Sequence, residues 1–445
     1  MKFWVLSAIS FTILTMAACG EQKPAEPVST TAPAATSAPV DQATMEPVVP
    51  RTATAPAPVP IATSIATAAP ALASTPSQRA TPTYTAAQTP SPSPTPITDH
   101  CPLPTPTDAQ VAGDQGEFSF AENDIVDGLL AASYLAGKPD DFRSIISDTG
   151  VDIVSVNTAN SPTGQAQYVA RQFANNDTVR IIRTSADIDA ALKGCVLGVV
   201  FYLQRAWPFE ASQTPLQAVE EWFQSGVRIA QLGYNQAYEP PRPYVRYFGY
   251  YESELTDLGR EVVGALLDYD ILIDVSHTLM PASLEIIEIA GKRGRPVTAN
   301  HANAQALHNH PRNKSDTEIC GIAQSGGTIG ITPIRSFVTW EDQVTTEQLV
   351  EHINYIVNLD CTDDKGSSIE MINHVSVATD ADVDGWDPNG ETGRRAYFNQ
   401  EMNSPDRWMA LASLLASAPN NYSADDLAKV FGGNLLRVYR AVFPG

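Results

Sequence analysis

The sequence has little positive charge for its length. Its 445 residues include 28 Lys and Arg against 50 Asp and Glu, which gives a formal net charge of -22. A protein that binds phosphate backbones needs the opposite balance, so nucleic acid is not expected as a partner. The five cysteines lack zinc-finger spacing, which argues against that class of metal site. No collagen or coiled-coil period is present.

The stretch from Glu21 to Gln110 has almost no aromatic residues and holds 19 of the 34 prolines. It consists mostly of Pro, Ala, Thr, Ser and Val. Because such a composition cannot bury enough apolar surface to offset chain entropy, we expect a disordered tether. About 90 flexible residues would give it an r.m.s. reach of roughly 50 Å. Residues 111–445 remain, which is enough for one large domain.

The first residues have the pattern of an export signal. Lys2 precedes an apolar run, Phe3 to Met16, that is too short to span a bilayer. Met16-Ala17-Ala18-Cys19-Gly20 follows and resembles a bacterial lipobox, where cleavage leaves a lipidated cysteine. We therefore expect a signal peptide over residues 1–18 and a lipid on Cys19. That lipid would hold the chain to a membrane of the cell envelope, facing the extracytoplasmic side. An ordinary signal peptide cut near Ala18 is the alternative.

Four other cysteines follow, at positions 101, 195, 320 and 361. An exported protein meets an oxidising compartment, so one or two disulfides are allowed. Cys195 and Cys320 lie in apolar segments, which favours buried thiols at both positions. The pairing cannot be deduced from the sequence.

Residues 111–445 contain short apolar runs rich in Val and Ile, separated by helical patterns. The eight runs are 125–126, 151–156, 196–202, 227–232, 271–275, 296–299, 327–331 and 374–378. Helices are predicted between them, over 216–225, 259–269, 282–291, 314–325 and 346–359, with closing helices over 406–417 and 424–443. Residues 384–406 are polar and are expected to form a long loop.

This alternation predicts an α/β fold with a parallel sheet. Eight strand–helix units in about 330 residues favour a (β/α)8 TIM-type barrel. A doubly wound open sheet is the alternative, and the lack of a Gly-rich phosphate turn after an early strand argues against it.

Polar residues follow the carboxyl ends of the predicted strands, which is where enzymes with this barrel have their active sites. Two histidines, His277 and His301, follow the fifth and sixth strands, and Asp380 follows the eighth. Neutral imidazole and carboxylate groups meeting at one mouth could hold a divalent metal such as zinc. The remaining candidates at strand ends are Asp127, Gln204 and Tyr234.

Four segments around these residues resemble the membrane dipeptidase family, peptidase family M19. They are residues 225–235, 255–277, 296–327 and 374–380, which include Asp274-Val275-Ser276-His277, Asn300-His301-Ala302-Asn303 and His310-Pro311-Arg312-Asn313. The resemblance implies a zinc-dependent (β/α)8 barrel that hydrolyses dipeptides. It implies that His277 and His301 bind metal, that Arg312 binds the substrate carboxylate, and that Asp380 acts at the active centre.

The sequence departs from the usual family pattern at the site, and three of five expected metal ligands are missing. The first-strand motif is Asp127-Gly128-Leu129-Leu130-Ala131, which lacks the family's two ligands there. Gln204 stands in place of a bridging glutamate, and Tyr234 in place of a histidine. This combination resembles a divergent bacterial branch of the family. We therefore expect one zinc ion or none, with Asp127 and Gln204 contacting substrate and Tyr234 donating to a developing oxyanion.

Two functions remain open at this point. The first is a tethered metal-dependent hydrolase of dipeptides or related small amides, acting outside the cytoplasm. The second is a non-catalytic binding or scaffold lipoprotein that keeps the barrel and has lost the two-zinc site. A homodimer is typical of renal-type relatives, but no residue here decides the oligomeric state.

Overall fold

The structure is a computed structural model, and it describes only part of the chain. The described residues are 110–113, 115–120, 122–130, 150–158, 179–194, 196–204, 214–234, 244–247, 252–341, 344–380 and 407–445. The chain divides into two units, Met1–Thr89 and Pro90–Gly445, and every described residue belongs to the second. The predicted signal peptide, Cys19, the tether and the 384–406 loop lie outside the described residues.

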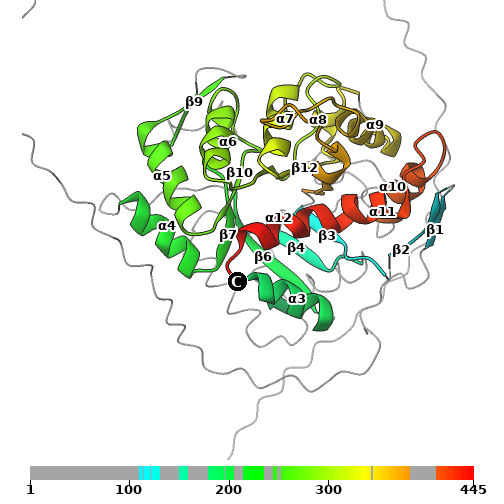
Figure 1. The fold of residues 1–445 in the computed structure, drawn as a ribbon, viewed down its shortest axis with the longest axis horizontal. Coiled ribbons are helices and arrows are strands. Elements are labelled where there is room, and N and C mark those ends of the chain that lie inside the picture. Colours follow the sequence, from blue (N-terminus) through cyan, green and yellow to red (C-terminus); the bar gives the residue numbers. More distant parts are fainter. Residues whose placement is uncertain are drawn as a thin grey trace, which may run out of the picture. The chain divides into compact units, whose positions relative to one another are not determined.

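Eight parallel strands form a nearly closed barrel, as the sequence predicted (Figure 1). All eight apolar runs became strands, because each is long enough to pair and apolar enough to be buried on both faces. They pair in the order in which they follow one another: β3 (Val126–Leu130), β4 (Ile153–Asn157), β6 (Leu197–Leu203), β7 (Val227–Ala230), β10 (Leu272–Asp274), β11 (Val297–Ala299), β12 (Thr328–Ile331) and β13 (Val375–Val377).

The two ends of this sheet meet at the carboxyl ends of β3 and β13. The backbone N–H of Asp380 donates to the carbonyl of Leu129 at 2.8 Å. The Thr379 N–H and hydroxyl both donate to the Asp127 carboxylate, at 2.9 and 2.6 Å. These bonds join the first and last strands. The carboxyl ends of all eight strands therefore surround one opening, the mouth of the barrel.

The predicted helices are present, with boundaries shifted by a few residues. Thr214, Ser315 and Thr345 each cap a helix through a reciprocal hydrogen-bonded box with the residue three positions on. None of the described helices is long and apolar enough to cross a membrane. The α-helices are α3 (Ser185–Gly194), α4 (Pro215–Gln224), α5 (Asp257–Asp268), α6 (Ala282–Lys292), α7 (Asp316–Gln324), α8 (Arg335–Val338), α9 (Thr346–Val357), α10 (Arg407–Ala416), α11 (Ala424–Ala428) and α12 (Asn434–Val442).

The structure also contains elements that were not predicted from the sequence, most of them only three to five residues long and therefore with little periodicity to recognise. Besides α3 and α8, the structure adds the 3-10 turn η2 (Met371–His374) and the strand β5 (Val179–Ile181), which pairs with the first half of β6. It also adds two antiparallel hairpins, β1 (Gln110–Gly113) with β2 (Gly116–Ser119), and β8 (Val245–Tyr247) with β9 (Ser253–Leu255).

Helix α12 covers the amino-terminal end of the barrel, which fixes the other end as the open one. The predicted helix over 424–443 is interrupted by a π turn, η3 (Lys429–Gly433), where a side chain on Gly432 would collide with the Asp124 carbonyl. Beyond it, the Asn434 amide donates to the carbonyls of Ile372 in η2 and Val375 in β13, both at 2.8 Å. The Tyr439 hydroxyl reaches Ser155 inside the barrel at 2.6 Å, and Figure 1 shows α12 lying across the strands.

One expectation about the cysteines is wrong. Cys320 was predicted to be a free buried thiol, but it forms a disulfide with Cys361, which joins α7 to the segment after α9. Two positions 41 residues apart in the sequence give no local signal that they will meet. Cys101 and Cys195 lie outside the described residues.

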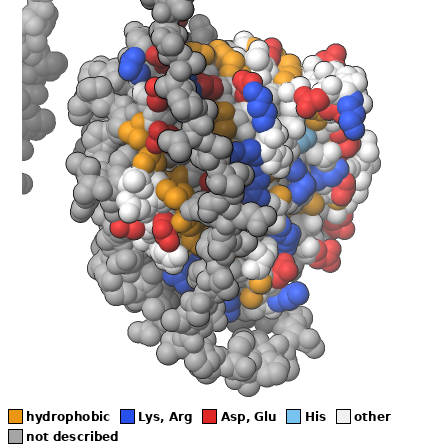
Figure 2. Space-filling view, turned by 60° about the vertical axis from the view of Figure 1, so that its left-hand side comes forward, with side chains coloured by type: hydrophobic (Ala, Val, Ile, Leu, Met, Phe, Trp, Pro, Cys, Tyr) orange, Lys and Arg blue, Asp and Glu red, His pale blue; other side chains and the backbone are white. Residues whose placement is uncertain are grey.

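The outer surface over α4, α5 and α6 carries both signs of charge side by side (Figure 2). Exposed cations on this face pair with acidic neighbours, as Arg293 does with Asp268 at 2.9 Å and Lys292 with Glu288. Such exposed pairs contribute little to stability. The described part of this face therefore presents no uniformly basic surface of the kind that binds a polyanion.

The half-buried carboxyl of Asp152, directly before β4, predicts a pH-dependent stability. Burial raises its pKa to about 7, so between about pH 4 and 7 the folded chain keeps a proton that the unfolded chain releases. The carboxyl is therefore uncharged and without cost to the folded state below about pH 4. The free energy of unfolding then falls as the pH rises from about 4 through 7, above which the folded carboxyl is ionised. Asp152→Asn should therefore raise the free energy of unfolding at pH 8 by about 1–4 kcal/mol, measured by urea unfolding at pH 4.5, 6 and 8.

The matched control for this prediction is Asp364→Asn, at an exposed position. It should leave the pH profile of stability unchanged. Equal destabilisation by Asp152→Asn at every pH would contradict the prediction, because the Asp152 carboxylate would then matter only as the acceptor of the Ile125 N–H, 2.8 Å away.

Candidate active site

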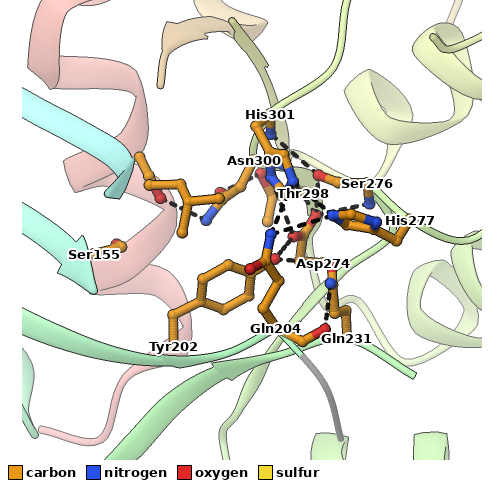
Figure 3. Close-up of polar contacts among 12 residues, drawn as sticks. Ser155, Tyr202, Gln204, Gln231, Asp274, Ser276, His277, Thr298, Asn300 and His301 are labelled. Carbon is orange, nitrogen blue, oxygen red and sulfur yellow. Dashed lines mark hydrogen bonds and ion pairs between the residues drawn. The ribbon is translucent and has the colours of Figure 1, made fainter. Parts of the chain in front are cut away.

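The carboxyl ends of three strands bring together the residues that form the centre of the site. Gln204 directly follows β6, His277 lies three residues after β10, and His301 lies two residues after β11. All three side chains are buried. Figure 3 shows them pointing toward one another at the mouth of the barrel.

The three side chains meet through one nitrogen each. His277 Nε2 and His301 Nε2 are 2.9 Å apart, and Gln204 Nε2 lies 3.2 Å from the first and 3.3 Å from the second. We call these three atoms the nitrogen triangle. The other atom of the Gln204 amide, Oε1, accepts a hydrogen bond from Asn157 Nδ2 at 2.6 Å.

A buried carboxylate, Asp274, holds the segments that carry both histidines. Its Oδ1 accepts hydrogen bonds from Ser276 N at 2.9 Å, Ser276 Oγ at 2.6 Å and Asn300 N at 3.0 Å. The Ser276 hydroxyl in turn accepts from His301 N at 3.0 Å. Each histidine is therefore next to a residue that is bonded to the same carboxylate.

The Tyr202 hydroxyl donates to the second oxygen of Asp274, and Gln231 Oε1 lies 2.8 Å from the same hydroxyl. Burial and the charge of Asp274 raise the pKa of Tyr202 well above its usual value, so this phenol stays protonated. Tyr202 and Gln231 were not among the predicted site residues. Their positions in the sequence could have indicated a role, because Tyr202 lies near the carboxyl end of β6 and Gln231 directly follows β7.

His301 is neutral at physiological pH. Burial lowers its pKa well below the usual value, and the nearby charges of Arg312 and Lys314 act in the same direction. Its Nδ1 forms no hydrogen bond with the described residues and lies 4.0 Å from Asp274 Oδ2. Neutral imidazole is the form that binds a metal ion, and the Asp274 carboxylate favours a proton on Nδ1, which leaves Nε2 as the ligand.

Tyr234 and Arg312 lie beside the nitrogen triangle. The Tyr234 ring stacks on His277 with centroids 4.2 Å apart. Arg312 is buried in the loop before α7, donates from Nε to the Ser276 carbonyl at 3.1 Å, and lies over the Phe337 ring at 4.8 Å. Burial lowers the pKa of Arg312, and the negative charge of Asp380 opposes that shift.

The two remaining predicted residues lie where β3 meets β13. Asp127 is buried and its carboxylate accepts hydrogen bonds from Thr379 and from the Leu129 N–H, so it joins the ends of the sheet. Burial raises the pKa of Asp127. Asp380 is half-buried, with a left-handed backbone at φ 50°. The structure thus brings Gln204, His277, His301, Tyr234 and Arg312 together, and it places Asp127 and Asp380 where β3 meets β13.

The donor set fits one metal ion held by neutral groups. Ligands at about 2.0–2.1 Å from a tetrahedral zinc lie about 3.3 Å apart, close to the edges of the nitrogen triangle. His277 and His301 can supply Nε2, and a half-turn of the Gln204 amide presents oxygen at the third corner. Among the described residues, no three His, Cys, Asp or Glu side chains are grouped to hold a metal. A second ion would need carboxylates that this arrangement lacks.

Restoring a charge at residue 204 should strengthen metal binding. We expect Gln204→Glu to raise the affinity of the full chain for zinc by about tenfold or more, because a carboxylate would replace a neutral amide beside two imidazoles. Competition with a chromophoric chelator measures the affinity. Gln224→Glu, at an exposed position on α4, is the control. Equal affinities of the parent and Gln204→Glu would show that residue 204 is not part of the ligand set.

The chain is similar to dipeptidases in sequence and to hydrolase structures in fold. It is 24% identical over 187 residues to an uncharacterised dipeptidase of Schizosaccharomyces pombe, covering 42% of this chain and 40% of the relative. The chain thus matches less than half of that relative's length. The barrel resembles an amidohydrolase of Pseudomonas aeruginosa, with a TM-score of 0.58, 24% identity and coverage of 73% of this chain and 98% of the other.

A second solved structure comes from Rhodobacter sphaeroides. It is a metallo peptidase liganded with a phosphinate mimic of the dipeptide L-Ala-D-Ala. Its TM-score is 0.56, with 17% identity and coverage of 72% of this chain and 99% of the other. At these identities the two structural matches show the fold. Residues 162–443, more than half of the sequence, match the membrane dipeptidase family, and the chain therefore belongs to that family, peptidase family M19.

Proposed function

We propose that the protein is a metal-dependent hydrolase of dipeptides or related small amides and uses one metal ion. The observation that carries this proposal is the nitrogen triangle, with edges of 2.9, 3.2 and 3.3 Å, beside the buried guanidinium of Arg312. Imidazole nitrogens at metal-ligand spacing next to a carboxylate-binding group suit a substrate that has an amide bond and a free carboxylate. Family membership supports the same reaction.

His277, His301 and Gln204 would hold the ion. When bound, it would polarise the scissile carbonyl and lower the pKa of a water molecule. Arg312 would bind the substrate carboxylate, because a guanidinium offers a planar fork of donors to two oxygens. Since Arg312 is anchored to the Ser276 carbonyl at 3.1 Å, the carboxylate it binds stays at a fixed place relative to His277.

Two further residues would move or hold protons. The Tyr234 ring is stacked on His277. A carbonyl that reacts beside His277 would lie near this phenol, whose hydroxyl would donate to the developing oxyanion. Asp380 would take the proton from the attacking water or bind the substrate amine. It lies just after β13, and its charge acts on Arg312, so a substrate carboxylate bound by Arg312 would lie in the same region of the mouth.

A non-catalytic binding protein is the second candidate, and the Gln204 amide favours it. A donor 3.2 and 3.3 Å from both imidazole nitrogens satisfies them without a metal. The same pocket could then bind a small carboxylate ligand through Arg312. The two functions differ in whether His301 is needed for metal content and turnover.

The deciding experiment compares His301→Ala with the parent. We expect the parent to hold about one zinc per chain by elemental mass spectrometry and to cleave dipeptides in preference to their C-terminal amides. His301→Ala should lose the metal and at least about 100-fold in kcat, because it loses one of two imidazole ligands. His352→Ala is the control. That buried imidazole accepts from the Ala304 N–H at 3.2 Å and lies outside the nitrogen triangle.

Retention of metal by His301→Ala would refute the ligand assignment. A parent that takes up no zinc and cleaves no dipeptide would instead favour the binding protein, and calorimetry with the same dipeptides would then measure its affinity.

We also propose that the protein is exported and held to a membrane through a lipid on Cys19. The Cys320–Cys361 disulfide supports this, because such bonds persist in oxidising compartments. Cys19→Ser should move the protein from the membrane to the soluble fraction and abolish labelling by a radioactive fatty acid. Cys361→Ser is the control and should stay in the membrane fraction. Membrane retention of Cys19→Ser would contradict a lipid anchor at that residue.

A further inference from the structure

A lysine is completely buried next to the candidate site. Lys314 has no exposed surface, and its ammonium donates to Glu318 Oε1 at 3.2 Å. Glu318 Oε1 also accepts from the Ser283 hydroxyl at 2.6 Å, and Oε2 accepts from Ser315 in the capping box of α7. Because an ion pair in the core is on balance no more stabilising than apolar residues of the same volume, stability does not account for this pair.

The Lys314 ammonium makes one more hydrogen bond, and it reaches the segment that carries His277. It donates to the carbonyl of Thr278 at 2.7 Å. On the other side of His277, the carbonyl of Ser276 accepts from Arg312 Nε at 3.1 Å. Two cations from one loop therefore hold the two carbonyls that flank His277.

His277 needs such support because it lies beyond the regular strand. Strand β10 ends at Asp274, and the chain turns at once, with Thr278 N donating to the Val275 carbonyl at 3.0 Å. His301, in contrast, is anchored by its own backbone N–H, which donates to Ser276 Oγ. The place of the His277 ring, 2.9 Å from His301 and stacked on Tyr234, therefore depends on how its flanking carbonyls are held.

We propose that Lys314, with Glu318 as its counter-ion, is a positioning residue for His277 and acts through the Thr278 carbonyl. The consequence for metal binding and catalysis rests on the proposed function. The effect of Lys314 on the placement of the His277 ring does not, since it is argued from the hydrogen bond between Lys314 and the Thr278 carbonyl.

The test is the double variant Lys314→Met/Glu318→Gln in the full chain. It removes both charges and keeps a side chain of similar length at 314, while Gln at 318 still serves the capping box. The matched control is Lys292→Met, which removes the lysine of another i,i+4 pair, with Glu288 on the exposed face of α6. Both variants should fold, with melting temperatures within about 5 °C of the parent.

Three measurements then decide the proposal. The imidazole 15N resonances of His277, among the seven histidines, should shift in the double variant and stay in place in Lys292→Met. The affinity for Co2+, followed by its visible absorption, and kcat for a dipeptide should both fall by about 10- to 100-fold. KM should change by less than about threefold, because Arg312 keeps its own contact with Ser276.

Unchanged His277 resonances in the folded double variant, with Co2+ affinity and kcat within twofold of the parent, would overturn the proposal. Failure of the double variant to fold would also overturn it, since the pair would then serve stability. If the parent neither binds Co2+ nor cleaves dipeptides, the proposed function fails, and the His277 resonances still decide the role of Lys314.

Discussion

The carboxylate of Asp274 is the interaction on which the mouth of the barrel depends. A buried charge must be surrounded by donors, because an uncompensated one is too costly to keep. Asp274 obtains them from Ser276, from the backbone of Asn300 and from Tyr202. Those donors come from three strands or the turns that follow them, so satisfying one charge sets the relative positions of β6, β10 and β11.

The fold could be predicted because its signal is local and repeated. Each barrel strand is a short apolar run, and counting the runs gives the number of strands. The predicted site residues at strand ends converge for the same reason, since all carboxyl ends of a parallel barrel share one mouth. The partners of those residues could not be predicted. Tyr202 and Lys314 acquire their importance from hydrogen bonds to residues 72 and 36 positions away, which no local pattern records.

The charges around the nitrogen triangle are arranged unusually for a metal site. The triangle itself is made of neutral groups, whereas Arg312 and Lys314 lie close enough to lower the pKa of His301. Cations so near disfavour a further positive ion and favour an anion. Lys314 has Glu318 as its counter-ion, and the nearby carboxylate of Asp274 is already bonded to several donors. An anionic substrate is thus better matched to this electrostatic setting than a bare ion, and substrate and metal would assist each other's binding.

The helix at the base of the barrel links the order of synthesis to folding. The Tyr439 ring fills the amino-terminal end of the barrel, where it meets Ser155 of an early strand, and α12 supplies Leu435, Leu436 and Val442 to the same interior cluster. Until the ribosome has released these residues, the strands enclose an apolar opening that water can reach. The barrel therefore cannot complete its core before α12 has been synthesised, so the strands alone do not form an independently folding unit.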